Sequence, residues 1–80
     1  MRVTIHVYAS LKDYFSPVFN LNLPERATLA DVISEIISQK PESSDTVHSC
    51  RLAVNQNYVD QNYILQGNEE ILLFPPSSGG

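Results

Sequence analysis

The chain has 80 residues and a formal net charge of −4, so it forms one small domain near the lower size limit for a self-sufficient hydrophobic core. Five Lys and Arg against nine Asp and Glu leave no basic stripe for phosphate groups, which excludes nucleic acid and acidic membrane surfaces as the main partners. The N-terminus alternates without a secretory pattern and no apolar run approaches the length of a spanning helix, so we expect a cytoplasmic protein.

Two alternating segments at the start of the chain predict a pair of strands. Residues 2–8 place valine or isoleucine at every second position, which indicates a strand with one buried face. Residues 18–23 repeat the pattern and end at Pro24. Because the connection is short, the two strands are expected to pair antiparallel, with a helical turn between them over Ser10 to Phe15.

The next segment predicts the main helix. Thr28 and Asp31 have the spacing of a capping box. Apolar side chains then recur at helical spacing and form one continuous stripe: Leu29, Val32, Ile33, Ile36 and Ile37. Lys40 complements the negative end of the helix dipole, and Pro41 is expected to stop the helix. The sequence therefore predicts an amphipathic helix of about three turns that covers one face of a sheet.

After this helix the pattern becomes weaker. Residues 41–49 are polar and have no period, so we interpret them as a surface loop. A short strand is expected over residues 51–55, with a tight turn at Gln56 and Asn57 and a return strand that begins at Tyr58.

The last third of the domain predicts one further strand. Ile64 and Leu65 are expected to tuck under the sheet before a turn at residues 66–68. Residues 70–74 then form the closing strand, and Glu69 is interpreted as part of its solvated start.

The order of these elements is that of an α+β fold, the β-grasp, in which a mixed sheet curls around one main amphipathic helix. A crossover through the helix returns the chain to the same sheet, and the closing strand is expected to lie parallel to the first at its centre. We expect the β-grasp domain to span residues 1–74 and residues 75–80 to form an extended, flexible C-terminal tail.

The C-terminal tail (residues 75–80) carries no charged side chain. Pro75 and Pro76 cannot continue a sheet interior and favour an extended path away from it. Gly79 and Gly80 lack a Cβ, so their backbone is able to enter a narrow tunnel. These features predict that the reactive group is the carboxylate of Gly80, with Gly79 beside it, inside the active site of a partner.

Strand alternation places aromatic side chains on the sheet face that the helix leaves free. Tyr8, Leu72 and Phe74 point to this face, with Tyr58 at its edge. A contiguous apolar patch at the base of the tail suggests a docking surface, and the alternative is that these side chains cover sheet edges within the monomer. The residues expected to contact a partner are Tyr8, Tyr58, Phe74, Pro75, Pro76, Ser77 and Ser78.

Other chemically active side chains are given plain interpretations. His48 and Cys50 supply only two of the roughly four ligands that a zinc site needs, so no metal site is predicted. Cys50 is the only cysteine, which excludes an internal disulfide. The sequence places no cation beside Cys50 that could activate its thiol except Arg51, so we interpret Cys50 as an incidental thiol.

Over its whole length the chain resembles a known family, the small sulfur-carrier subunit of molybdopterin synthase, within the ubiquitin-like β-grasp sulfur carriers. The resemblance is carried by residues 7–9 (Val-Tyr-Ala), residues 53–56 (Ala-Val-Asn-Gln), Gly67 and, above all, residues 74–80 (Phe-Pro-Pro-Ser-Ser-Gly-Gly). Gly-Gly on a β-grasp alone would also fit a thiamin-type sulfur carrier or a ubiquitin-like protein modifier.

The resemblance implies a sequence of partners. A ubiquitin-activating-like adenylyltransferase would use ATP to adenylate Gly80, and a sulfur donor protein would convert the adenylate to a thiocarboxylate. The large subunit, in a heterotetramer, would receive the tail, and the sulfur would pass to a cyclic pyranopterin precursor in molybdenum cofactor biosynthesis. The catalytic side chains are then expected on the large subunit, with no permanently bound cofactor on this chain.

Overall fold

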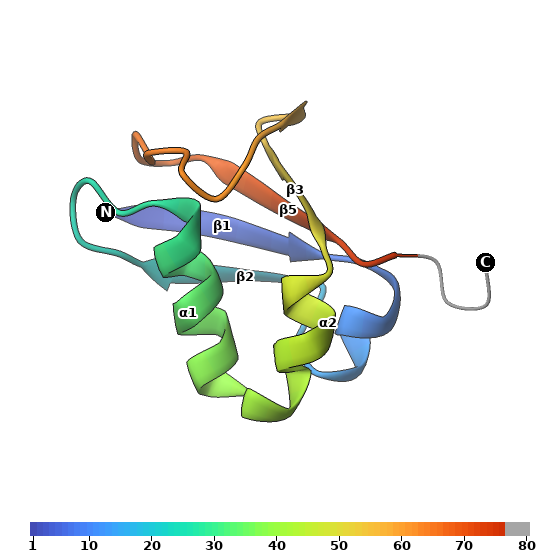
Figure 1. Cartoon of the computed structure of the whole chain (residues 1–80). Coiled ribbons are helices and arrows are strands. Elements are labelled where there is room, and N and C mark those ends of the chain that lie inside the picture. The colour runs from blue at the N-terminus through green and yellow to red at the C-terminus, as the bar shows by residue number, and fades with distance from the viewer. Residues whose placement is uncertain (77–80) are drawn as a thin grey trace.

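The computed structural model describes residues 1–76, and these form a five-stranded sheet with its helices on one face (Figure 1). In chain order the elements are β1 (Arg2–Val7), η1 (Ala9–Asp13), β2 (Val18–Asn22), α1 (Leu29–Gln39), η2 (Pro41–Ser43), α2 (Ser44–His48), β3 (Arg51–Val54), β4 (Asn57–Tyr58) and β5 (Glu70–Phe74). The N-terminus and the end of β5 lie at opposite ends of the molecule (Figure 1).

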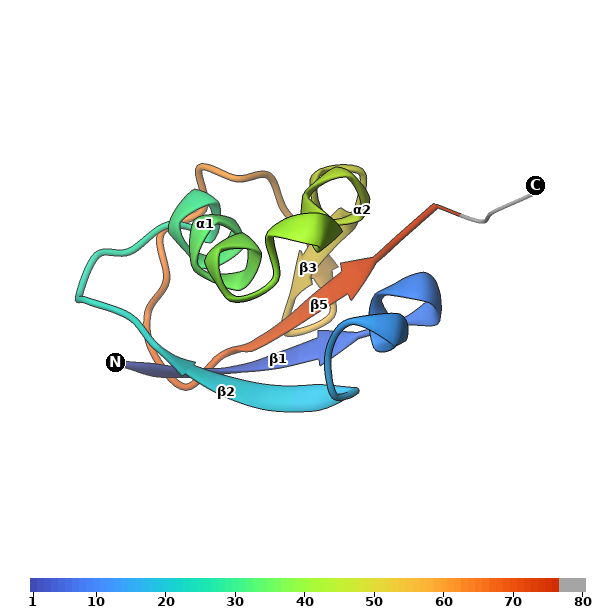
Figure 2. The same cartoon turned by 90° about the horizontal axis from the view of Figure 1, so that it is seen from below.

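The strands lie in the order β2-β1-β5-β3-β4. β1 pairs antiparallel with β2 and parallel with β5, and β5 pairs antiparallel with β3. Figure 2 shows α1 and α2 packed across the same face of this sheet. The predicted α+β class and the β-grasp arrangement, with first and last strands parallel at the centre, are confirmed.

The core lies between the sheet and the helices. The inward residues of the central strands are almost fully buried: Val3, Ile5, Val7, Ile71 and Leu73 are at most 2% exposed. The predicted stripe of α1 meets them, with Leu29, Val32 and Ile36 fully buried and Ile33 4% exposed. Burial of each such side chain stabilises the fold by about 1.5–3 kcal/mol. A shift of the strand register by one residue would turn these side chains to the solvent, so their burial selects the observed register.

The capping box at the start of α1 is present as predicted. The Thr28 hydroxyl accepts a hydrogen bond from the Asp31 backbone N–H, and the Asp31 carboxylate accepts one from the Thr28 backbone N–H at 2.8 Å.

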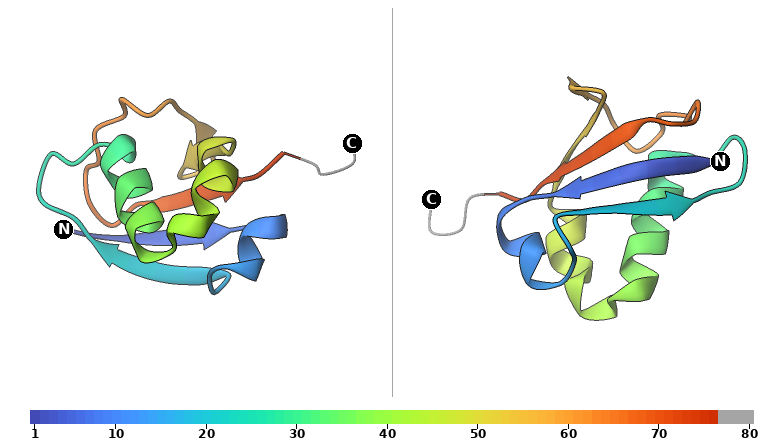
Figure 3. Two further views of the ribbon diagram at one scale, coloured as in Figure 1. Left: turned by 60° about the horizontal axis from the view of Figure 1, so that its bottom comes forward. Right: turned by 180° about the vertical axis from the view of Figure 1, so that it is seen from behind.

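Figure 3 shows α1 and α2 side by side against the sheet. No helix in residues 1–76 has both the length and the apolar character needed to cross a bilayer.

The prediction of a surface loop over residues 41–49 was wrong. Pro41 begins the short helix η2, which leads directly into α2. Val47 is 1% exposed and belongs to the core, while Ser43 is fully buried and donates its hydroxyl to the Lys40 carbonyl at 2.7 Å. Because one helical turn carries only one apolar anchor, this segment shows no periodic pattern in the sequence.

The hairpin between β3 and β4 turns one residue earlier than predicted. Asn55 and Gln56 have φ values of 49° and 76°, the two positive values that a two-residue hairpin turn of this kind requires. Asn57 is already in β4. Further on, Leu65 is buried as predicted, but Ile64 is 54% exposed, so only one of these two residues tucks under the sheet.

The prediction that Glu69 is solvated was also wrong, because its side chain is buried, with 3% exposed. Its carboxylate accepts hydrogen bonds from the backbone N–H groups of Gln66 and Gly67, at 2.7 and 2.9 Å, and from the Tyr63 hydroxyl at 2.7 Å. Gly67 itself has a φ of 109°, a value that a residue with a Cβ adopts only with strain. The buried carboxylate therefore holds the turn that leads into β5.

Candidate functional site

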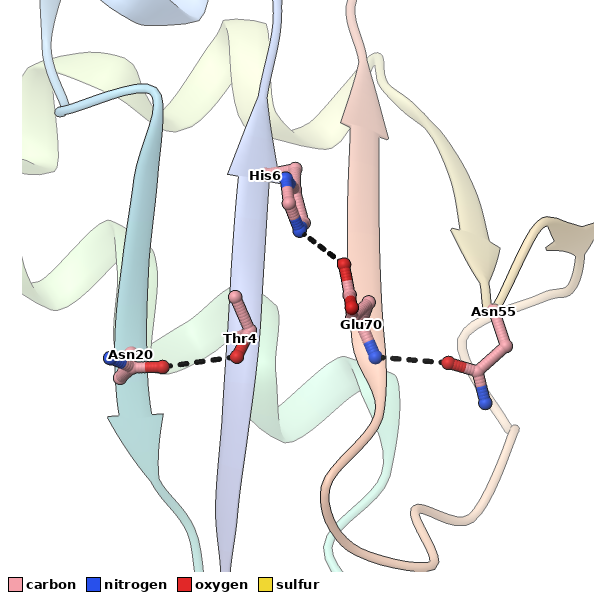
Figure 4. Close-up of polar contacts among 5 residues, drawn as sticks. All are labelled: Thr4, His6, Asn20, Asn55 and Glu70. Atoms are coloured by element: carbon pink, nitrogen blue, oxygen red, sulfur yellow. Dashed lines mark hydrogen bonds and ion pairs between the residues drawn. The ribbon is translucent and has the colours of Figure 1, made fainter.

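The sheet face opposite the helices is left open, and polar side chains lie along its central strands. The Thr4 hydroxyl donates to the Asn20 side-chain oxygen at 3.0 Å, and His6 pairs with Glu70 at 2.7 Å (Figure 4). The Glu70 backbone N–H donates to the side chain of Asn55 at 3.1 Å (Figure 4). These contacts link three strands, β2, β1 and β5, and the turn that follows β3.

The open face of the sheet carries more apolar side chains towards the end of β5. A row of cross-strand neighbours crosses the whole sheet and consists of Val18, His6, Leu72, Ala53 and Tyr58. Its two outer members are the most exposed, Val18 at 52% and Tyr58 at 64%. The open face therefore presents apolar surface on both flanks of β5.

Three aromatic rings, which we call the aromatic cluster (Tyr8, Tyr58 and Phe74), lie together at the end of β5. The Tyr8 and Phe74 rings stack with their centroids 4.7 Å apart and their planes at 9°. Tyr58 meets Phe74 edge-on at 6.3 Å, and the Arg51 guanidinium carbon lies 4.6 Å from the centroid of the Tyr58 ring. Such ring pairs add about 0.5–1.5 kcal/mol beyond their buried area.

The position of Tyr8 follows from the turn after β1. Ala9 has a φ of 52°, so the chain changes direction immediately after Tyr8 and enters η1. Leu11 anchors η1 with a fully buried side chain, and its N–H donates to the Tyr8 carbonyl at 3.2 Å. The backbone of Tyr8 is thereby fixed while its ring stays on the open face, 37% exposed.

The structure therefore brings three of the predicted contact residues, Tyr8, Tyr58 and Phe74, into one contiguous cluster that remains partly exposed. Pro75 and Pro76 follow directly after β5, the first half-buried and the second exposed. The tail thus begins at the cluster. The remaining predicted site residues, Ser77, Ser78, Gly79 and Gly80, lie outside the described residues.

Arg51 was not predicted as part of this site. It is the register partner of Phe74, so both side chains belong to the same face of neighbouring strands. Its position in the alternation of β3, two residues before Ala53, was the sequence signal that could have placed Arg51 on the open face. The sequence alone did not show that the hairpin folds Tyr58 back over it.

Cys50 lies next to this region, and its half-buried surroundings disfavour the thiolate. Burial raises the pKa of its thiol to about 11, and the thiol donates a weak hydrogen bond to the Thr46 carbonyl at 3.3 Å. In nearly all molecules the Cys50 thiol is therefore protonated near neutral pH. The described residues contain no group of three or more His, Cys, Asp or Glu side chains arranged to hold a metal ion.

Comparison with known proteins identifies relatives of the whole domain. The sequence profile of the ThiS family matches residues 5–80. The chain is 36% identical over 63 residues to the molybdopterin synthase sulfur carrier subunit of Dictyostelium discoideum, a match that covers 75% of this chain and 73% of the relative. It is 34% identical over 65 residues to the protein of the same name from Arabidopsis thaliana, covering 80% and 67%.

Solved structures share the fold. SAMP1 from Haloferax volcanii superimposes with a TM-score of 0.88 at 19% identity, and the match covers the whole of both chains. A chain of the complex of subunits 1 and 2 of molybdopterin-converting factor from Helicobacter pylori has a TM-score of 0.72 at 23% identity, again over the whole of both chains.

Proposed function

The chain belongs to the ThiS family, and we propose from this membership that it acts as the sulfur-carrier subunit of molybdopterin synthase. The observation that carries the proposal is the match to curated relatives from Dictyostelium discoideum, Arabidopsis thaliana and Chlamydomonas reinhardtii, all three of which are molybdopterin synthase sulfur carrier subunits. The chain is thus one part of a sulfur-transfer complex.

The proposed reactive group is the carboxylate of Gly80. A carboxylate is a resonance-stabilised anion with a poor leaving group, so its oxygen must first be activated. In the proposed sequence this oxygen attacks the α-phosphorus of ATP on an adenylyltransferase, releasing pyrophosphate and forming an acyl-adenylate. Sulfide-level sulfur from a donor protein then attacks the acyl carbon, the bond to AMP breaks and AMP leaves. The product is a thiocarboxylate, which is a softer nucleophile than the original carboxylate.

The role proposed for the folded domain is to dock and to aim the tail. The aromatic cluster offers a rigid apolar anchor, and its rings are already stacked before a partner arrives, which lowers the entropy lost on binding. Pro75 lacks an N–H for further sheet pairing, so the chain leaves β5 in an extended direction. In this proposal Ser77 and Ser78 are small spacers that fit a narrow tunnel.

The proposed receiver of the tail is the large subunit of molybdopterin synthase, which supplies the acid, base and electrostatic groups that act on a pyranopterin precursor. The Helicobacter pylori relative in structure is a component of a complex of subunits 1 and 2, which supports this choice of partner. Burial of the tail in that subunit excludes the water that would hydrolyse the thiocarboxylate. We further propose a heterotetramer, because a dithiolene needs two sulfur atoms.

Two other functions fit the same fold: a thiamin-type sulfur carrier and a ubiquitin-like modifier of lysines. The shared name of the three curated relatives favours the pterin pathway over the thiamin pathway. Lysine-linked adducts in extracts would favour the modifier.

Intact-mass spectrometry tests the proposal directly. The chain is expressed together with its adenylyltransferase and sulfur donor, and a variant that lacks Gly80 serves as the control. We expect the full chain to gain the mass of one oxygen-to-sulfur exchange and the control to gain none. The mass of the unloaded protein also establishes whether Gly80 is the last residue of the mature chain. A full chain that stays unmodified under these conditions contradicts the proposal.

A further inference from the structure

Arg51 places a positive charge beside the strand that leads into the tail. It is exposed and lies opposite Phe74 in the register of β3 and β5. Its guanidinium carbon is 4.6 Å from the centroid of the Tyr58 ring, a distance at which the ring face attracts a cation. The aromatic ring thus holds the guanidinium in place next to the aromatic cluster.

The positive charge of Arg51 has no carboxylate partner within the part of the chain that the structure describes. Among residues 1–76 the single ion pair joins His6 and Glu70. Asp60, Arg51 and Tyr58 line one open groove, whose volume is about 550 Å³. The Asp60 carboxylate accepts a hydrogen bond from the Asn62 backbone N–H at 2.8 Å. No nitrogen–oxygen contact within 4.0 Å joins the Asp60 carboxylate to Arg51.

Four of the nine acidic side chains lie in the helical layer, and Glu70, on the open face, is hydrogen-bonded to His6 at 2.7 Å. Exposed carboxylates on α1, η2 and α2 belong to Asp31, Glu35, Glu42 and Asp45. These helices cover the opposite face of the sheet (Figure 2). A partner that approaches the aromatic cluster thus meets a cation, although the whole chain has a net charge of −4.

Docking on the aromatic cluster removes water from Arg51. A guanidinium that loses its water without gaining an acceptor weakens the complex, whereas a carboxylate binds its planar fork through two parallel hydrogen bonds. We propose that Arg51 selects a partner whose docking surface presents a carboxylate beside the pocket for Phe74, with Tyr58 holding the guanidinium in position. This inference rests on the proposed function, since it takes the large subunit as the partner.

The test measures the affinity of the purified chain for the large subunit of the same organism by isothermal titration calorimetry. Arg51→Gln removes the charge, Arg51→Lys keeps it, and Arg2→Gln is the matched control, because Arg2 is exposed at the opposite end of β1. We expect Arg51→Gln to weaken binding about tenfold or more, the loss typical of a charge-assisted hydrogen bond. Arg51→Lys should recover part of this loss, and Arg2→Gln should change the affinity less than about twofold.

Salt provides a second reading of the same interaction. Raising the ionic strength should weaken binding of the wild-type chain more than binding of Arg51→Gln, because only the former forms the ion pair. Equal affinities and equal salt dependence of Arg51→Gln and the wild-type chain would overturn the inference. A wild-type chain that does not bind the large subunit at all would instead count against the proposed function.

Discussion

The ring of Phe74, the last residue of β5, stacks almost parallel on the ring of Tyr8, the first residue after β1, with centroids 4.7 Å apart. The two strands are parallel neighbours, so both chain segments leave the sheet at the same end. One segment turns back into η1 and the other becomes the tail. The stack therefore lies where β5 ends, directly before Pro75.

We predict that Phe74→Ala weakens binding to the large subunit by about 1–3 kcal/mol, the range of an aromatic anchor at an interface. The variant loses the stack on Tyr8 and the edge contact with Tyr58, so the partner meets a hollow in place of a ring. Isothermal titration calorimetry measures the effect, and circular dichroism confirms that the variant is folded.

Val18→Ala is the matched control for this prediction. Val18 is also an exposed apolar residue of the open face, but it lies on β2, at the opposite edge of the sheet from β4. Its truncation is expected to change the affinity by less than about 0.5 kcal/mol. If both variants bind as tightly as the wild-type chain, the aromatic cluster is not the docking surface.

A chain extended by one alanine after Gly80 should fold normally and fail to acquire sulfur. Leu73 is the last buried core residue and β5 ends at Phe74, so we expect the extension to leave the core packing unchanged. The Gly80 carboxyl, however, becomes a peptide carbonyl and cannot be adenylated. Thermal unfolding tests the first expectation and intact-mass spectrometry after co-expression tests the second. Sulfur on the extended chain would show that the reactive group lies elsewhere.

The thiol of Cys50 should react slowly with iodoacetamide while the protein is folded. Its pKa is raised by burial from 9.0 to about 11, which makes the thiolate about a hundredfold scarcer at pH 8. The same chain in concentrated urea is the control and should react at the rate of an ordinary cysteine. Fast alkylation of the folded chain would indicate an activated thiol and a direct role in sulfur chemistry.

The elements predicted well from the sequence are those with a long, regular pattern. The alternation of β1 and the stripe of α1 each repeat several times, and burial of one face selects a single register for them. The capping box at Thr28 and Asp31 was also predictable, because both partners lie within one turn. The parallel placement of β5 beside β1 followed from the order of the elements.

The errors fall where stability comes from contacts between distant residues. Val47 is the only apolar anchor of α2, so the helix shows no period, although that side chain is fully packed. Glu69 is polar and still buried, because three hydrogen-bond donors converge on it only after the chain has folded. No local pattern distinguishes such a carboxylate from a solvated one.

The candidate site was likewise predictable from the sequence only in part. The cluster of Tyr8, Tyr58 and Phe74 could be predicted, because strand alternation assigns each ring to a face. The contact of Arg51 with Tyr58 could not, because it depends on a hairpin whose turn lies at Asn55 and Gln56, one residue away from the predicted position.

The partly buried hydrogen bond between Tyr63 and Glu69 predicts a loss of stability in alkali. The Glu69 carboxylate accepts the Tyr63 hydroxyl, and this bond, with smaller contributions from burial and from the negative charge of Glu69, raises the pKa of Tyr63 above its ordinary value of 10.0. Above that pH the unfolded chain releases the tyrosine proton before the folded chain does. The free energy of unfolding should therefore fall as the pH rises through the raised pKa, while the contribution of the bond is complete below about pH 10.

Urea unfolding of the wild-type chain and of Tyr63→Phe, at pH 8 and at alkaline pH, measures this contribution. Other tyrosines and lysines titrate in both proteins, so the difference between the two isolates Tyr63. We expect the wild-type chain to be the more stable at pH 8 and its advantage to shrink in alkali, because phenylalanine has no proton to lose. An advantage that stays constant over this range would mean that the Tyr63 hydroxyl does not donate to Glu69 in solution, and the turn into β5 would then depend on the backbone N–H groups of Gln66 and Gly67 alone.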